Sequence, residues 1–312
     1  MISRFVPLLA GVLLLPGSAF SQWQPVRSLG ILNPFQDNPA AAGSAECLDL
    51  HVGHRAQWTG IEGAPVTSYA NLHGQRSSGG PHFHGYGVRV EVDEAGAWSE
   101  TSVRFGWAYN MRLMQGGRLA AGLSAGLGQT RLDLGSLRLP EVGAGADPAI
   151  AAASQGVVPE IDLGVWYYDR EKFAGLSVLQ TTQPLLSRMT AGTRLSRQIV
   201  AVAGQEFDTE GRWDIEPRLQ VRLGKGLPPV VDVWTWLHLE DRFAFAVGYR
   251  NQSALLLACK GRIANYMTLA YAYDFGVGPL AGPAGGSHEL VLGLNACRGG
   301  GPGRYVKCPA YD

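Results

Sequence analysis

The sequence is poor in charge and in long apolar runs. Only 17% of its 312 residues are charged, and the two signs cancel to a formal net charge of zero; a soluble domain carries about 25%. Sparse, balanced charge gives no argument for nucleic-acid binding or electrostatic steering. Beyond the first few dozen residues there is no run of 18 or more apolar residues, so a membrane-spanning helix is not expected.

The abundant features are glycine, with 42 residues, and a two-residue alternation of side-chain type. Leu119, Ala121, Leu123, Ala125 and Leu127 alternate with small residues, and the segments 231–239 and 241–250 alternate in the same way. Successive side chains of a strand point to opposite faces, so each segment has an apolar face and a small or polar face. Segments of about ten such residues joined by turns are typical of outer-membrane barrels.

We therefore predict an all-β fold, a transmembrane antiparallel outer-membrane β-barrel of about 14 strands. The predicted strands are 45–58, 65–76, 82–92, 98–112, 117–132, 157–168, 171–180, 191–207, 212–224, 229–239, 241–250, 253–260, 263–274 and 287–297. A soluble β-sandwich is the alternative, but this number of strands is large for one sandwich domain.

Short and long connections largely alternate along the chain. The predicted short turns are 115–117, 169–171, 209–211, 240–241 and 260–262, and the predicted long loops are 133–156, 180–190 and 275–286. Outer-membrane barrels have short periplasmic turns and longer outer loops. This rule predicts that both termini lie in the periplasm.

Four segments make up the predicted organisation. Residues 1–21 have a basic start, an apolar core and small residues before Gln22, as in a secretory signal peptide. Residues 22–44 do not alternate and form an irregular leader, placed either in the periplasm or inside the lumen as a plug. The barrel follows over 45–297, and 298–312 form a C-terminal periplasmic tail.

Charged side chains within the predicted strands should face the lumen, because an Arg at mid-membrane on the lipid face costs about 2–4 kcal/mol. They are Arg89, Arg104, Glu216, Arg218, Arg222 and Asp232. Their mixed signs favour a plugged or narrow lumen. Aromatic residues near the strand ends are expected to form interfacial girdles; they are Trp58, Trp107, Tyr109, Trp166, Tyr167, Tyr168, Trp234, Trp236, Tyr271 and Tyr273.

Three patterns that resemble catalytic or metal sites have simpler explanations. Ser124 lies in a G-x-S-x-G pattern, but inside an alternating strand rather than at a strand-to-helix turn. His82 and His84 share a face near His73, without a third ligand of suitable spacing. Ser287, His288 and Glu289 follow Asp274 around one loop, where a hydrogen-bond network that orders the loop is expected. We expect no enzyme activity, metal or cofactor.

Cysteine is scarce. Cys47, Cys259, Cys297 and Cys308 form no C-x-x-C pair, which argues against a thiolate metal site. Cys47 begins the first predicted strand and Cys297 ends the last, and these strands are neighbours in a closed barrel. A Cys47–Cys297 or Cys47–Cys308 disulfide is therefore the candidate, with free thiols as the alternative.

Several motifs, in order along the mature chain, resemble the PorP/SprF family of type IX secretion system membrane proteins. They are NPAAAGS at 38–44, HRAQWTGIEGAPVTSYANLHG at 54–74, IDLGVWYYDREKFAGLSVLQ at 161–180 and LAYAYDFGVGPLAGPAGGSHELVLGL at 269–294. The chain departs from the family pattern at Leu290 and in the Gly-rich stretch 299–303. The resemblance implies an outer-membrane barrel that works with the type IX machinery. Some relatives act with its periplasmic parts, and others help to export and hold a surface adhesin.

The resulting functional prediction is a non-enzymatic barrel of type IX secretion and gliding motility. It docks, exports or anchors a secreted adhesin that has a C-terminal sorting domain, or contacts other secretion components. The predicted partner-binding or loop-ordering residues are Trp58, Tyr271, Tyr273, Asp274, Ser287, His288 and Glu289. The alternatives are an outer-membrane channel for small solutes and, with no convincing triad, a barrel-embedded hydrolase.

Overall fold

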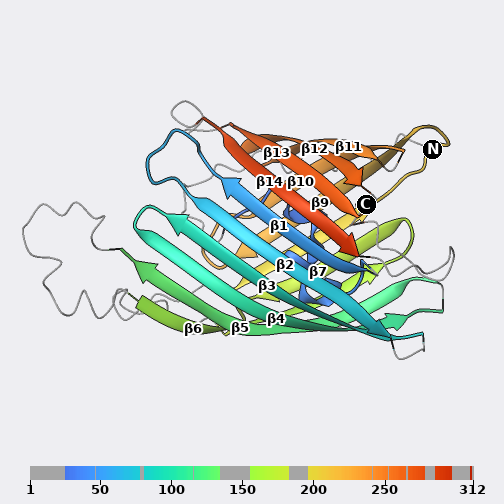
Figure 1. Cartoon of the computed structure of the whole chain (residues 1–312), viewed down its shortest axis with the longest axis horizontal. Helices are drawn as coiled ribbons and strands as arrows, with labels where there is room; N and C mark the ends of the chain where they lie inside the picture. Colours follow the sequence, from blue (N-terminus) through green and yellow to red (C-terminus); the bar gives the residue numbers. More distant parts are fainter. Residues whose placement is uncertain are drawn as a thin grey trace, which may run out of the picture.

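A closed barrel of antiparallel strands makes up most of the computed structural model (Figure 1). The structure describes residues 25–45, 47–77, 81–114, 116–133, 155–182, 196–240, 242–251, 253–264, 266–277, 285–296 and 310. Each strand pairs with its neighbours in sequence, and β1 closes the barrel against β14. Within these residues, no helix has the length and apolar character needed to cross a membrane.

The described strands are β1 Leu48–Ala56, β2 Val66–Ser77, β3 Phe83–Ala95, β4 Trp98–Arg112, β5 Arg118–Leu132, β6 Gln155–Tyr168, β7 Lys172–Leu179, β8 Gln198–Gln205, β9 Trp213–Gly224, β10 Val230–Leu239, β11 Phe243–Arg250, β12 Ala254–Ala264, β13 Met267–Gly276 and β14 Ser287–Ala296. The prediction of a closed antiparallel barrel of 14 strands is confirmed over the described residues.

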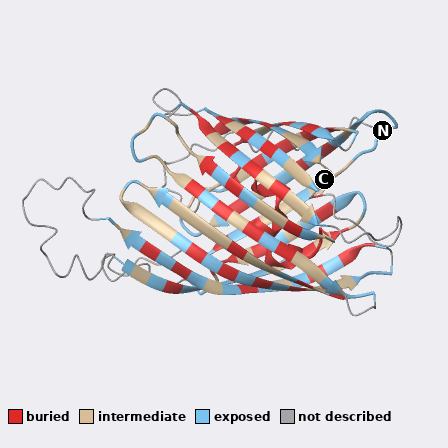
Figure 2. Ribbon diagram, in the orientation of Figure 1, coloured by how far each residue is buried: buried red, intermediate tan, exposed pale blue. Residues whose placement is uncertain are grey.

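Burial alternates along the strands as the sequence pattern predicts (Figure 2). On β5, Leu119, Leu123 and Leu127 are 37%, 41% and 58% exposed, whereas Ala120 and Ser124 between them are fully buried. The outer surface is thus a band of Leu, Val, Ile and Phe side chains suited to lipid, and the polar side chains face the lumen.

The barrel has two distinct ends. We name the end where β5 and β7 finish the long-loop end, and the end where β4 passes into β5 and β6 into β7 the short-turn end. The predicted turn at 260–262 is wrong, because Lys260 and Gly261 still pair with β13 and the strand continues to Ala264 across an irregularity in the ladder.

Residues 25–45, which we call the plug, lie inside the barrel and are almost entirely buried. They form three short 3-10 turns, η2 Gly30–Leu32, η3 Pro34–Gln36 and η4 Pro39–Ala41. Pro34 and Pro39 each take the first position of a turn, where a missing N–H costs nothing. The leader is thus inside the lumen over these residues.

The plug runs through the lumen from one end to the other. Pro25 lies beside Gln198 and Gly224 at the long-loop end, while Gly43 contacts Gly85 in the short-turn half. Pro25 is thus at the opposite end from Leu48, which begins β1. The leader therefore crosses the lumen before the first strand begins, and the expectation that both termini lie in the periplasm stays a prediction, because residues 1–24 and 297–309 lie outside the described residues.

Several aromatic residues predicted at the membrane interfaces point into the lumen instead. Trp166, Tyr168, Trp234 and Trp236 are at most 1% exposed. Each lies on the inward-facing set of its strand, the same set that carries the buried charges. The interfacial prediction holds better for Trp107, which is 38% exposed on the outer face.

Candidate functional site

Glycines of the barrel wall bring the plug backbone into direct contact with the strands. A Cβ at Gly122 of β5 would lie 2.5 Å from the backbone N of Ala40, and Cβ atoms at Gly85 and Gly164 would lie still closer to Ala42 and Asn38. The amide of Asn38 donates to the Val165 carbonyl at 2.9 Å and its Oδ1 accepts from the Ala40 N–H at 2.9 Å. The lumen is shaped to this plug, not merely filled by it.

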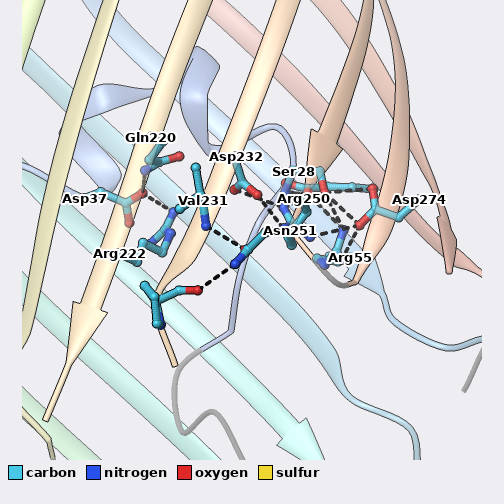
Figure 3. Close-up of polar contacts among 12 residues, drawn as sticks. Ser28, Asp37, Arg55, Gln220, Arg222, Val231, Asp232, Arg250, Asn251 and Asp274 are labelled. Carbon is cyan, nitrogen blue, oxygen red and sulfur yellow. Dashed lines mark hydrogen bonds and ion pairs between the residues drawn. The ribbon is translucent and has the colours of Figure 1, made fainter. Parts of the chain in front are cut away.

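Asp37 at the end of η3 anchors the plug to the wall by its charge (Figure 3). Its carboxylate accepts from Arg222 and Arg27 at 2.7 Å each, and from Gln220 at 3.1 Å. Burial raises the pKa of Asp37, but the guanidinium groups of Arg222 and Arg27 outweigh burial and hold the pKa well below its usual range. Arg27 also pairs with Glu91 of β3.

Ser28 anchors the plug to a second part of the wall, formed by β13, β14 and β1 (Figure 3). Its hydroxyl donates to Asp274 at 2.7 Å, and its backbone N–H donates to Glu289 at 2.6 Å. Arg55 and Arg250 balance these carboxylates, at 2.6 Å and 3.3 Å from Asp274. We call the Asp37 and Ser28 contacts together the clamp.

The other strand charges also pair inside the lumen, as predicted. Arg89 donates to Asp162 at 2.7 Å, Arg104 to Glu160 at 2.5 Å, Arg218 to Glu216 at 2.5 Å and Arg250 to Asp232 at 2.7 Å. Arg218 also donates to the Ile31 carbonyl of the plug at 2.9 Å and to the Ala310 carbonyl at 3.3 Å. Ala310 is fully buried, so this residue of the C-terminal segment does not lie in a free tail.

The predicted site residues separate onto two faces of the wall. Asp274 and Glu289 face the lumen and belong to the clamp. Tyr271 and His288 lie on the outer side, joined by a hydrogen bond of 2.7 Å, so Asp274 and His288 do not meet. Near the loop, the Trp58 N–H donates to Ser287 Oγ at 3.1 Å and the Tyr273 hydroxyl donates to the Gly285 carbonyl at 2.8 Å.

The remaining candidate motifs form no reactive site. Ser124 is buried between Arg89 and Asp162, with no histidine among its hydrogen-bond partners. His73 is buried in the lumen, whereas His82 and His84 lie on the outer side. In the described part of the chain, no three His, Cys, Asp or Glu side chains are grouped to hold a metal ion.

Two cysteines are described. Cys47 is disulfide-bonded, and Cys259 is free and exposed. Cys297 and Cys308 lie outside the described residues, so the pairing of Cys47 stays a prediction. The loops 134–154 and 183–195 and most of 275–286 also lie outside them.

The sequence pattern did not single out the plug side chains of the clamp, Arg27, Ser28 and Asp37. The only signal was indirect: unpaired charges on the strands required partners in the lumen, and the leader was the segment without strand character. Which leader residue meets which wall residue depends on how the chain crosses the lumen.

Comparison with known proteins gives a family and a fold. The model of the family described as type IX secretion system membrane protein PorP/SprF matches residues 20–294. The toluene transporter TbuX of Ralstonia pickettii is similar in structure, with a TM-score of 0.50 and 12% identity over 84% of this chain and 92% of that one. The toluene transporter TodX of Pseudomonas putida has a TM-score of 0.50 and 9% identity over 87% and 94%. At these identities the structures show the barrel fold alone. No curated protein sequence matches.

Proposed function

Because the chain belongs to the PorP/SprF family of type IX secretion system membrane proteins, we propose that it is a plugged docking barrel of that system in the outer membrane. It holds a secreted adhesin with a C-terminal sorting domain, or another secretion component, and passes no solute through its lumen. The observation that carries this proposal is the plug, which crosses the lumen and is fixed to the wall at β9 and at β13 by the clamp.

A docking role makes different use of the barrel from a transport role. A transport barrel needs a continuous polar or apolar path through its lumen. Here the inward-facing charged side chains form ion pairs with the plug and with one another. A rigid barrel with long loops at one end is a suitable platform for recognition, because binding residues are commonly carried on loops positioned by a scaffold. The loops 133–156, 180–190 and 275–286 and the adjoining luminal face are the proposed contact surface.

Conductance separates docking from the solute-channel alternative. The purified protein in planar bilayers is expected to be silent across a voltage range that leaves the bilayer intact. A stable open-state conductance of the unmodified protein would favour the channel and contradict the docking proposal.

Partner retention tests the docking proposal directly. Affinity purification from the native envelope, followed by mass spectrometry, is expected to recover type IX components or a secreted protein with a sorting domain. Deletion of 136–154 should leave the barrel folded and abolish that recovery. If recovery survives the deletion, the assignment of docking to this loop fails.

A further inference from the structure

The outer face of the wall carries a group of cationic and aromatic side chains at the short-turn end of β2, β3 and β4. We call this group the rim patch, and its residues are Arg76, His82, His84, Tyr86, Trp107 and Tyr109. Arg76, next to last in β2, is the Cα partner of His84, the second residue of β3. His84 in turn pairs with Tyr109 of β4. Because residues directly opposite each other in a ladder share a face, these three side chains form one row.

The rim patch lies where the lipid-facing apolar band ends. Farther from the short-turn end, the outward-facing positions carry Leu72 of β2 and Phe105 of β4, which are 36% and 67% exposed. Tyr86 and Trp107, at 51% and 38% exposed, form the row between this band and the row of Arg76. Aromatic rings with a polar group favour the headgroup level of a bilayer, so the row of Arg76 faces headgroups rather than acyl chains. In Figure 1 this end of the strands lies at the right of the barrel.

Two hydrogen bonds fix which nitrogen of each imidazole in the patch carries the proton. The Trp107 indole N–H donates to His84 Nδ1 at 3.3 Å, and the Arg112 backbone N–H donates to His82 Nδ1 at 3.4 Å. A neutral imidazole has one donor nitrogen and one acceptor nitrogen. Since Nδ1 is the acceptor in both rings, Nε2 carries the proton in both, and each ring offers an N–H donor.

The donors of the patch are gathered around one phenol ring. The ring centroid of Tyr109 is 5.2 Å from that of His84 and 6.0 Å from that of His82. Arg76 is exposed in the same row, and no carboxylate among the described residues pairs with it. A guanidinium and two imidazole N–H groups are all donors, so the patch suits an anion rather than a metal ion.

We propose that the rim patch binds the phosphate of an anionic phospholipid headgroup in the leaflet at the short-turn end. Arg76 supplies the charge, and His82 and His84 donate from Nε2. The planar fork of a guanidinium matches two phosphate oxygens, which makes arginine well suited to this role. An arginine at the headgroup level keeps its charge in polar surroundings, so its outward position costs little. The site belongs to the barrel wall and goes beyond the proposed docking function, on which it does not depend.

Lipid retention by the purified protein tests the site. The protein in a mild detergent is titrated with phosphatidylglycerol or with phosphatidylcholine, and native mass spectrometry measures the retained lipid. We expect phosphatidylglycerol to be retained about fivefold more tightly, and Arg76→Gln to lose about fivefold in that retention, the size expected for one basic residue near an anionic lipid surface. Equal retention of the two lipids overturns the proposal. Displacement of the lipid by inorganic phosphate would mean a site for a free anion and would also overturn it.

Arg131→Gln is the matched control. Arg131 is also an exposed arginine on the outer face, but it lies near the long-loop end of β5 and its Cα partner is Ser99 rather than a histidine. This variant should retain phosphatidylglycerol within about twofold of the unmodified protein. An equal loss in Arg76→Gln and Arg131→Gln would show that any exposed arginine suffices, and the rim patch would then be no specific site.

The two histidines provide a second test that does not depend on Arg76. The double change His82→Phe and His84→Phe keeps two rings beside Tyr109 and removes both N–H donors. We expect about a threefold loss of phosphatidylglycerol retention, as for two hydrogen bonds at an exposed surface. Unchanged retention overturns the role of the imidazoles, and this variant decides the proposal if Arg76→Gln does not fold.

Discussion

Asp37→Asn is the sharpest test of whether the plug is clamped by charge. The change keeps the side-chain shape but removes the carboxylate that faces Arg27, Arg222 and Gln220. Arg27 retains Glu91, whereas Arg222 has no second carboxylate within the described structure. One buried guanidinium is therefore left without a counter-charge.

The magnitude follows from burial. Removing one partner of a buried ion pair costs about 3–5 kcal/mol, and an amide that still accepts one hydrogen bond places the cost near the lower end. A loss of about 3 kcal/mol corresponds to a change of roughly 150-fold in the equilibrium between docked and undocked plug. The matched control is Glu240→Gln, which makes the same carboxylate-to-amide change in the exposed pair with Arg212 at 2.6 Å. An exposed pair contributes about 0.2–1 kcal/mol.

The assay is single-channel recording in planar bilayers, with a denaturant titration of the folded barrel beside it. Asp37→Asn should give brief conductance events, because its undocked fraction is expected to be about 150-fold higher than that of the unmodified protein, which should be silent. Glu240→Gln should remain silent. Indistinguishable behaviour of Asp37→Asn and Glu240→Gln would refute the clamp.

The pKa of Asp37 is lower in the folded chain than in the unfolded one. Its contribution to folding stability is therefore fully present above the unfolded carboxyl pKa of about 3.9, and it is lost only as pH falls through the lower folded value. The difference in unfolding free energy between the unmodified chain and Asp37→Asn should be constant from pH 7 to 4 and shrink below pH 4. Gly122→Ala places a Cβ 2.5 Å from the plug backbone and should destabilise the plug by about 1–3 kcal/mol, whereas Gly261→Ala, whose Cβ meets nothing closer than 3.5 Å, should change conductance and stability little. Under non-reducing conditions, mass mapping should find Cys47 in a peptide joined to Cys297 or Cys308 and Cys259 alkylated; alkylation of all four thiols would exclude the bridge.

The alternation predicted the barrel and the facing of most side chains. An unpaired charge on the lipid face is too costly, and this rule predicts from the sequence alone that the strand arginines point inward, namely Arg89, Arg104, Arg218 and Arg222. Trp234 and Trp236 were predicted at the membrane interface, and that prediction was wrong. Aromatic rings favour the membrane interface in general, but the period of two placed both on the same face as Asp232 and therefore inside.

The residues of the clamp were harder to predict from the sequence than the strands of the barrel wall. Asp274 and Glu289 were selected as residues that order a loop, and they hold Ser28 of the plug instead. The turn at 260–262 was placed too early, because a Gly between two charges is typical of a turn and is also tolerated within a strand.

The sequence by itself determined that the chain is a 14-stranded barrel with a lipid-facing apolar surface and a lumen of mixed charge, because strand facing depends only on residue order and on the cost of placing charge in lipid. Only the tertiary structure decided that the leader crosses the lumen and is clamped by Asp37 and Ser28. Those contacts join residues up to 261 positions apart, as Ser28 and Glu289 are, and no local pattern encodes which distant partners a closed barrel brings together.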